Sequence, residues 1–236
     1  MYNTMDVINK LERKKMQTLS DLTPYIGDYT PLMKLFLVLT ALMFLGTIVF
    51  MMTSFVRIII TFSFIKSALG AQQSIPNQVL VGLAICLTMF VMAPTVKQIN
   101  DQALKPYMNN EIKFEQAIEK AEVPVRKFLL KQTRQEDIKL FVDNSDVNKK
   151  KMTRNNIPLY ILVPAFAISE LKTAFQIGFL IYLPFLLIDL VVSSVLMSMG
   201  MFMLPPVMIS LPFKLLLFIM VDGWNLLIKS LLLSFQ

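Results

Sequence analysis

The sequence contains no histidine, a single cysteine (Cys86) and only seven glycines. Without histidine there can be no Ser-His-Asp triad, no Cys-His catalytic pair and no HExxH zinc site. One cysteine excludes an intrachain disulfide and a zinc ribbon. The glycines never adopt the spacing of a dinucleotide-binding or P-loop motif. We therefore expect a protein that is not an enzyme and that holds no cofactor or metal.

Charged residues are also scarce, at 17% of the 236 residues, whereas 55% of the residues are hydrophobic. The mean hydropathy is +0.60. This apolar excess is too large for the core of a soluble domain and is typical of a membrane protein. The net charge is +7. Most of the basic residues share their segments with acidic ones, which does not favour nucleic acid as a partner.

The first part of the chain contains a polar segment and two apolar runs. Residues 1–34 are polar with mixed charge, and they contain no secretory apolar stretch. Residues 35–56 are uncharged and would be roughly 33 Å long as a helix, enough to cross a bilayer core. A second apolar run extends from Val79 to about Val96. Residues 35–96 therefore predict a first helical hairpin, with a connector between the runs.

Residues 97–156 are sharply different, since they hold 13 of the 23 basic residues and nine of the 16 acidic ones. Their periodicity predicts a helix over Glu111–Ala121, an interruption at Pro124 and a second helix over Val125–Phe141. We expect a small helical insert outside the membrane. Its Lys/Arg content would place it in the cytoplasm, but its length is near the limit of about 60 residues at which that rule stops applying. Charge alone leaves the orientation open.

Residues 157–236 contain two long apolar stretches, 173–204 and 207–235, which predict a second helical hairpin. The fold class is accordingly all-α, a polytopic membrane protein of two hairpins and an insert. A lone charge at the centre of a membrane helix costs about 2.5–3.5 kcal/mol, so such residues usually pair or line a wet interior. The sequence positions of the charges suggest that the partners come from other segments or other chains. The charged residues of this region are Glu170, Lys172, Asp189, Lys214, Asp222 and Lys229.

Methionine recurs with a period of two from Met197 to Met203, just before Pro205-Pro206. A period of two makes no stripe on an α-helix. Gly200 and the two prolines disfavour helix here, which predicts a loop over residues 199–206. If several chains meet on one axis, such loops would form a soft apolar plug that closes by dewetting. From spacing alone, simple packing in a bundle core is the more economical interpretation.

Three blocks of sequence carry a resemblance to a known family. One is VPAFAISELKTAFQIGF, residues 163–179. Another begins with LPFLLID at residues 183–189, continues through MSMGMFMLPPVMISLPFKLLLF and ends with Val221-Asp222-Gly223-Trp224. A third combines FVRI at 55–58 with PNQVL at 76–80 and Met92-Ala93-Pro94. From about residue 35 onward the chain resembles the FliP family, which forms part of the flagellar type III export gate.

The resemblance implies a membrane-embedded pore subunit rather than an enzyme. FliP-like chains assemble as a ring-like or helical homo-oligomer, with five copies expected, together with FliQ-like and FliR-like subunits. FlhA-like and FlhB-like components and the basal body ring belong to the same apparatus. Unfolded flagellar proteins are the exported cargo, and the bacterial inner membrane is the implied location. The family also implies that the insert lies on the extracytoplasmic side.

The resemblance further assigns roles to individual residues. It implies a pore gasket and an ion pair between neighbouring copies. The further functional charges in the membrane and the residues that shape the loop are expected from the residues themselves. Phe202 departs from the family, whose members commonly have methionine there, and makes the seal bulkier. The gasket is Met199, Met201, Phe202 and Met203; the pair is Glu170 and Lys214; the other charges are Asp189, Asp222 and Arg57; the loop-shaping residues are Gly200, Pro205 and Pro206.

Other interpretations remain open. An injectisome-type export subunit would share this mechanism with a different cargo. A self-contained ion or solute transporter would instead use Asp189, Lys214 and Asp222 as a relay within one chain. The N-terminus also departs from the family, which usually begins with a cleavable signal peptide that residues 1–34 do not resemble. The first apolar run would then serve as the signal anchor, or the start differs in this lineage.

Overall fold

The structure is a computed structural model that describes residues 31–44, 46–71, 74–145 and 156–235. The chain divides into two units, residues 1–49 and 50–236, and each is described by itself. The described residues form helices joined by turns and loops, without strands. The expected all-α class is therefore confirmed.

The first unit contributes most of the helix Pro31–Met51, whose side chains are largely exposed and apolar. Its threonines satisfy their hydroxyls locally, since Thr40 Oγ1 donates to the carbonyl of Phe36 and Thr47 Oγ1 to that of Met43. This helix is long and apolar enough to cross a membrane. It ends at Met51, five residues before the end of the apolar run that predicted it.

The segment between the first two apolar runs, expected as a connector, contains helix α2 (Phe55–Ala68). One face of α2 is buried through Ile58, Phe62 and Ile65. Gly70 ends the helix at φ +69°, and the amide of Ala71 bonds the carbonyl of Lys66 at 3.2 Å. This is the hydrogen bond of a Schellman ending, which a residue with positive φ makes possible.

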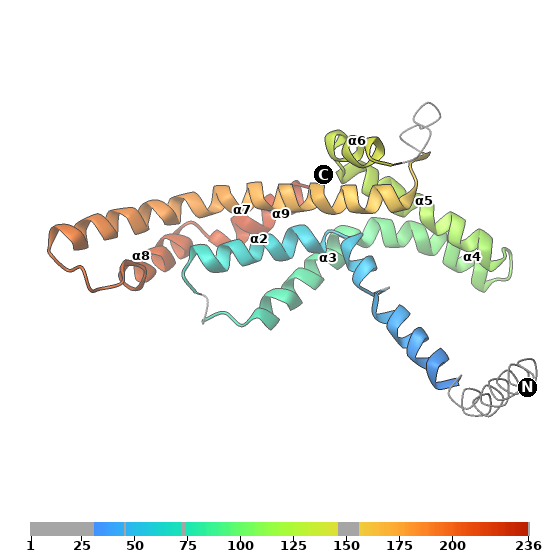
Figure 1. The fold of residues 1–236 in the computed structure, drawn as a ribbon, viewed down its shortest axis with the longest axis horizontal. Coiled ribbons are helices and arrows are strands. Elements are labelled where there is room, and N and C mark those ends of the chain that lie inside the picture. The colour runs from blue at the N-terminus through green and yellow to red at the C-terminus, as the bar shows by residue number, and fades with distance from the viewer. Residues whose placement is uncertain (1–30, 45, 72–73, 146–155, 236) are drawn as a thin grey trace, which may run out of the picture. The chain divides into compact units, whose positions relative to one another are not determined.

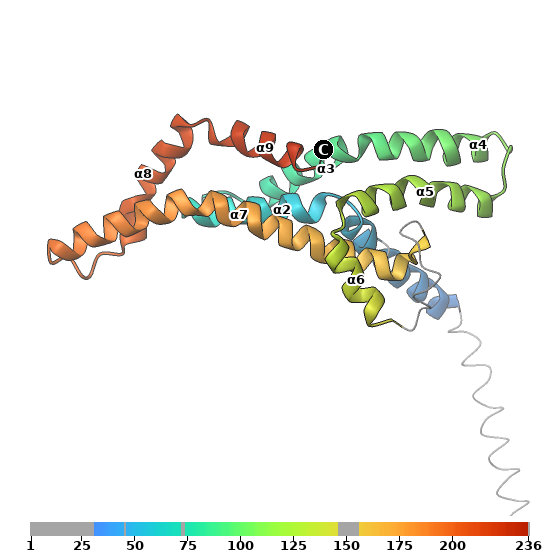
Figure 2. The same ribbon diagram turned by 90° about the horizontal axis from the view of Figure 1, so that it is seen from above.

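Helix α3 (Asn77–Ile99) continues through a π-helical turn, η1 (Asn100–Leu104), into α4 (Lys105–Met108). A turn with Asn110 at φ +59° leads into α5 (Phe114–Gln132), which runs back beside α3 (Figure 2). The predicted interruption at Pro124 is wrong, because α5 continues through it. Proline removes one helical hydrogen bond, and the burial of Pro124 among neighbouring helices compensates for that loss. Helix α6 (Gln135–Asp143) follows.

Helix α7 (Leu159–Ser198) has 40 residues and begins 14 residues before the predicted apolar stretch. At 1.5 Å per residue it is about 60 Å long, roughly twice the thickness of a bilayer core. Helix α8 (Pro206–Met220) follows the loop after α7, and α9 (Gly223–Leu233) turns away from α8 by 64°. The described residues thus contain three helices that could span a membrane, or four if α8 and α9 form one broken span.

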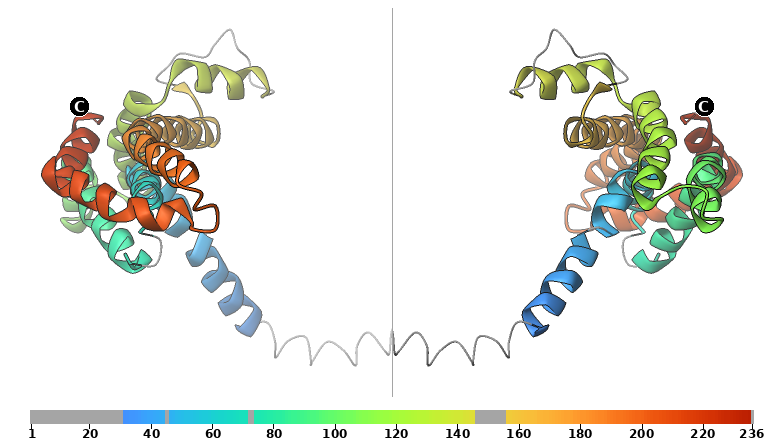
Figure 3. Two further views of the ribbon diagram at one scale, coloured as in Figure 1. Left: turned by 90° about the vertical axis from the view of Figure 1, so that its left-hand side faces the viewer. Right: turned by 90° about the vertical axis from the view of Figure 1, so that its right-hand side faces the viewer.

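The second unit has two buried clusters along α7. The larger one joins α2, α3, the middle of α7 and the α8–α9 segment. The end-on views of Figure 3 show α2 lying among these helices. The smaller one joins α5 and α6 to the first turns of α7, with Leu129, Leu162 and Phe166 fully buried. Figure 1 shows α7 as the element beside which most of the others lie. Because α7 belongs to both clusters, its position, and with it the position of Glu170 and Asp189 on this helix, is fixed by packing.

Candidate functional site

Arg57, on the first turn of α2, is the centre of a buried polar network. Its Nε donates to Glu170 Oε2 at 2.9 Å, and Nη2 donates to Glu170 Oε1, so the pair is bidentate. Nη1 donates to the carbonyl and the hydroxyl of Ser234 at 2.8 and 2.9 Å. Nη2 also reaches Gln132 Oε1 at 3.1 Å. All five guanidinium donors therefore have acceptors, which is the condition under which a buried arginine is tolerated.

This network connects residues that are far apart in the sequence. Arg57 comes from α2, Gln132 from the end of α5, Glu170 from α7 and Ser234 from the end of α9. The guanidinium carbon also lies 3.9 Å from the centre of the Phe235 ring, a cation–π contact. Gln132 Nε2 in turn donates to the carbonyl of Phe235 at 2.9 Å. Four helices are thereby held at one point.

A second charged cluster connects α7 to α8. Lys214 Nζ donates to Asp189 Oδ2 at 2.6 Å, and the Ser210 hydroxyl donates to Asp189 Oδ1. Ser210 and Lys214 are four residues apart, so one face of α8 presents both donors to the carboxylate. Lys214 is 2% exposed. Each oxygen of Asp189 thus has one donor, as each oxygen of Glu170 does.

The pairing within the chain differs from the pairing expected between chains. Glu170 contacts Arg57 and Lys214 contacts Asp189. Arg57 and Asp189, expected only as further functional charges, are therefore the direct partners of the two residues singled out. A contact between Glu170 of one copy and Lys214 of the next stays a prediction, because the structure describes a single chain.

Sequence reasoning missed the uncharged members of both clusters. Gln132, Ser234 and Ser210 supply acceptors or donors to the charges but belong to no recognisable motif. A third buried contact was missed as well, in which Ser169 Oγ donates to Asp137 Oδ2 at 2.6 Å and ties α6 to α7. The spacing of Ser210 and Lys214 on one helical face was a signal that could have been used.

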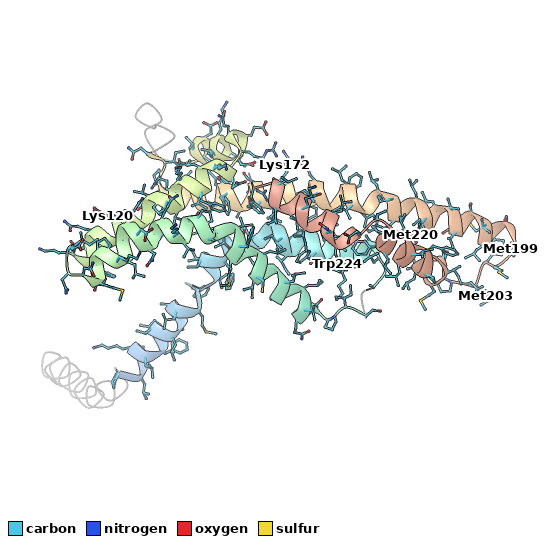
Figure 4. The ribbon with its side chains drawn as sticks, turned by 180° about the vertical axis from the view of Figure 1, so that it is seen from behind. Lys120, Lys172, Met199, Met203, Met220 and Trp224 are labelled. Atoms are coloured by element: carbon cyan, nitrogen blue, oxygen red, sulfur yellow. The ribbon has the colours of Figure 1, made fainter. Side chains whose placement is uncertain are left out.

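The loop between α7 and α8 is Met199–Pro205. Gly200 stands at φ +75°, and the amide of Met201 bonds the carbonyl of Leu196 at 3.0 Å, another Schellman ending. Pro206 is the first helical residue of α8, where its missing N–H is harmless. Phe202 and Met203 are 79% and 97% exposed. Figure 4 shows Met199 and Met203 at one end of the second unit, with Lys120 towards the other.

Asp222 occupies the bend between α8 and α9. Its φ of +49° is left-handed, and it is the N-cap of α9 without a side-chain capping bond. Gly223 follows in a position where a Cβ would lie 2.3 Å from the Phe218 ring. The Trp224 ring stands 5.4 Å from that of Phe218 and 6.5 Å from that of Phe62, centre to centre. The bend is therefore fixed by close aromatic packing.

Comparison with known proteins supplies the family. The FliP family matches residues 38–231. The chain is 57% identical to the flagellar biosynthetic protein FliP of Bacillus subtilis over 202 residues, which cover 86% of this chain and 91% of the relative. The chain belongs to the FliP family.

More distant relatives carry the same description. The flagellar biosynthetic protein FliP of Pectobacterium carotovorum is 52% identical over 197 residues, which cover 84% of this chain and 76% of the relative. That of Aquifex aeolicus is 43% identical over 211 residues, or 89% of this chain and 88% of the relative. This FliP-family chain is thus a membrane component of flagellar biosynthesis and protein export, in agreement with its apolar helices.

Proposed function

We propose that this chain is a pore-forming core subunit of the flagellar type III protein export gate. In this role it passes unfolded flagellar proteins across the inner membrane through a central channel. The Met-rich loop closes that channel. The observation that carries the proposal is the exposure of this loop. Phe202 and Met203 have most of their surface uncovered, and Met203 lies at one end of the second unit (Figure 4).

At the tip of this loop, the side chains of Phe202 and Met203 are left largely uncovered by the rest of the described residues. Several copies around one axis would bring Met201, Phe202 and Met203 of each copy together, and burial of that surface would favour the closed state. Thioether side chains are flexible and can seal an irregular gap and then move aside for a passing chain. The stiffer Phe202 ring would add bulk to the seal.

The two ion-pair clusters would keep the loop in place during transport. Asp189 and Lys214 join α7 to α8 below the loop, so the two helices that carry the loop cannot separate without exposing a charge. Arg57 and Glu170 fix α7 to α2 further along. In this proposal the helices form a rigid frame and only the loop moves.

The proposed assembly is a homo-oligomer of about five copies with FliQ-like and FliR-like subunits, and FlhA-like and FlhB-like components act beside it. The proposed location is the flagellar basal body in the inner membrane, with the insert on the extracytoplasmic side. These assignments rest on the family to which the chain belongs. Isolation of the tagged chain in mild detergent should yield two further small membrane proteins.

The gate is tested by ion conductance. Replacing Met201 and Met203 with alanine should leave the complex assembled but leaky to small ions, and deletion of Met199–Pro205 should leak more. Met108→Ala is the matched control, because Met108 is also exposed but lies at the end of α4, away from the loop. An assembled Met201→Ala/Met203→Ala complex with wild-type conductance would contradict the gate.

A self-contained transporter is less well supported. Such a protein needs a continuous series of titratable groups, and Asp189 and Lys214 do meet inside one chain. However, Asp222 forms no ion pair with either of them among the residues that the structure describes, and it lies at the separate bend before α9. Among the described residues, Asp189 and Lys214 therefore form a closed ion pair rather than part of a relay.

A further inference from the structure

An open groove of about 790 Å³ lies where α3, α5 and the end of α9 meet. Its walls are mainly apolar, with Phe90 and Val91 from α3, Phe128 from α5 and Leu232 from α9. Two lysines of α5, Lys127 and Lys131, also line it. This combination of apolar walls and a few charged groups is typical of a ligand site rather than of a packing defect.

The two lysines are available to a ligand. They are four residues apart, so both ammonium groups project from one face of α5. Both side chains are exposed, and neither forms an ion pair within the described residues. The carboxylates that are closest to them in sequence, Glu122 and Glu136, already bind Arg126 and Arg134. The groove consequently presents two positive charges to whatever occupies it.

The groove lies at the level where the sequence of α3 changes from apolar to polar. Phe90 and Val91 belong to the apolar run, whereas Gln98 lines the same groove and Asp101 follows three residues later. Phe90 is also 68% exposed, so the apolar wall continues onto the outer surface of α3. An occupant could therefore keep a polar head at the lysines and apolar chains along α3.

We propose that the groove binds an anionic phospholipid, with its phosphate at Lys127 and Lys131 and its acyl chains on the α3 wall. Lysine is a common partner of phosphate groups, and two exposed lysines beside an apolar wall match the charged head and the apolar chains of an anionic lipid. The floor of the groove includes Gln132 and Phe235, which also contact Arg57. A bound lipid would thus stabilise the Arg57 network from outside. The inference does not depend on the export gate.

The test measures lipid binding to the purified, delipidated complex by native mass spectrometry. Phosphatidylglycerol should bind more tightly than phosphatidylcholine of the same chain length. Lys127→Ala/Lys131→Ala should weaken the binding of phosphatidylglycerol by roughly 30-fold, at about fivefold per lysine. Lys120→Ala/Lys139→Ala is the matched control, because these exposed lysines do not line the groove. Phosphatidylglycerol should also raise the melting temperature of the wild-type complex.

Further variants distinguish the sources of the phosphate. Lys127→Arg/Lys131→Arg should retain the binding of phosphatidylglycerol. Phe90→Ser should weaken this binding, although it leaves both lysine charges in place. Soluble glycerol phosphate should bind far more weakly than the lipid; equal affinity would overturn the lipid assignment. Three results would each overturn the proposal. They are equal binding of the two lipids, unchanged binding of phosphatidylglycerol to the double alanine variant, and no lipid binding because a protein chain covers the groove.

Discussion

The two buried cations of this apolar molecule each have one carboxylate partner, whereas the buried carboxylate of Asp137 accepts from Ser169. Arg57 and Lys214 are two buried cations, and each meets one carboxylate whose two oxygens both accept hydrogen bonds. Burying an ion pair is costly, and removal of one partner is more costly still because the other charge stays buried. The clusters therefore provide a specific arrangement of helices more than they provide net stability.

Arg57→Lys tests whether the fork geometry matters as well as the charge. Lysine has three donors on a single nitrogen and cannot reproduce a bidentate contact together with the bonds to Gln132 and Ser234. We expect a loss of about 3–5 kcal/mol, the range for breaking a buried pair. Thermal unfolding of the complex in detergent measures it. Arg134→Lys is the control, since its partner Glu136 is exposed and the change should cost less than about 1 kcal/mol.

Charge swaps can decide which partner Lys214 uses in the assembly. Lys214→Ala should impair assembly and motility, because Asp189 then loses its cation. Asp189→Lys with Lys214→Asp should recover part of the loss if the contact within the chain is the important one. Glu170→Lys with Lys214→Glu should recover part of it only if neighbouring copies meet there. Normal assembly and motility of the single variants would contradict a role for either contact, and Lys229→Ala serves as an exposed control.

Among the elements, α7 is the one whose length is least expected, and it packs very closely against α2 at one point. Its Gly178 lies so close to α2 that an added Cβ would stand 2.5 Å from the Phe64 ring. Further along, Phe64 and Phe175 meet edge to face with ring centres 5.1 Å apart. Glycine is needed here for close approach of two helices and not for an unusual backbone conformation.

Gly178→Ala should therefore destabilise the protein by about 1–3 kcal/mol, the usual cost of overpacking. Gly82→Ala is the matched control, because Gly82 is also within a helix but has nothing near its Cβ position. That change should be neutral or stabilising by up to about 1 kcal/mol. Melting temperatures of the two variants give the comparison. Phe64→Ala should recover part of the Gly178→Ala loss, and equal melting of the two glycine variants would refute the close contact.

The sequence predicts that the elements are helical, and it predicts less well where they end. Apolar runs and the scarcity of glycine lead directly to long helices, and Gly200, Pro205 and Pro206 mark the loop before α8. The interruption at Pro124 was predicted wrongly because proline always removes one helical hydrogen bond. Whether the helix nevertheless continues depends on tertiary packing, and Pro124 is buried within α5. The first turns of α7 were missed because the charges of Glu170 and Lys172 interrupt the apolar run there. The partners of Arg57 lie on three other helices, so no local pattern could reveal them.

On the scale of the whole molecule, the length of α7 limits how the chain can lie in a membrane. A helix of about 60 Å would need a tilt of about 60° to stay within a 30 Å hydrocarbon core, which exceeds the usual range of 0–40°. Part of α7 must therefore extend beyond the bilayer or be surrounded by other protein. Its two prolines do not shorten it, since the helix is continuous through Pro164 and Pro184.

The proposed orientation can be tested with a single reporter cysteine. Cys86 would first be replaced by serine, and Asn144, exposed after α6, by cysteine. A membrane-impermeant maleimide should label Asn144→Cys in intact cells stripped of their outer membrane. Asn148, which would serve as a second reporter position in the same insert, lies outside the described residues. Labelling that occurs only after permeabilisation would show that the insert lies on the cytoplasmic side instead. The Cys86→Ser variant without the new cysteine measures the nonspecific signal.

The Arg57 network also has a consequence for biosynthesis. Glu170 follows Arg57 by 113 residues and Ser234 by 177 residues. At 5–20 residues per second the ribosome needs roughly 6–23 s to deliver the carboxylate, and longer to deliver the serine. During that delay the guanidinium has none of its native acceptors from α7 or α9. The nascent α2 must therefore wait at an interface or beside an insertion factor, and final packing of the second unit is a post-translational event.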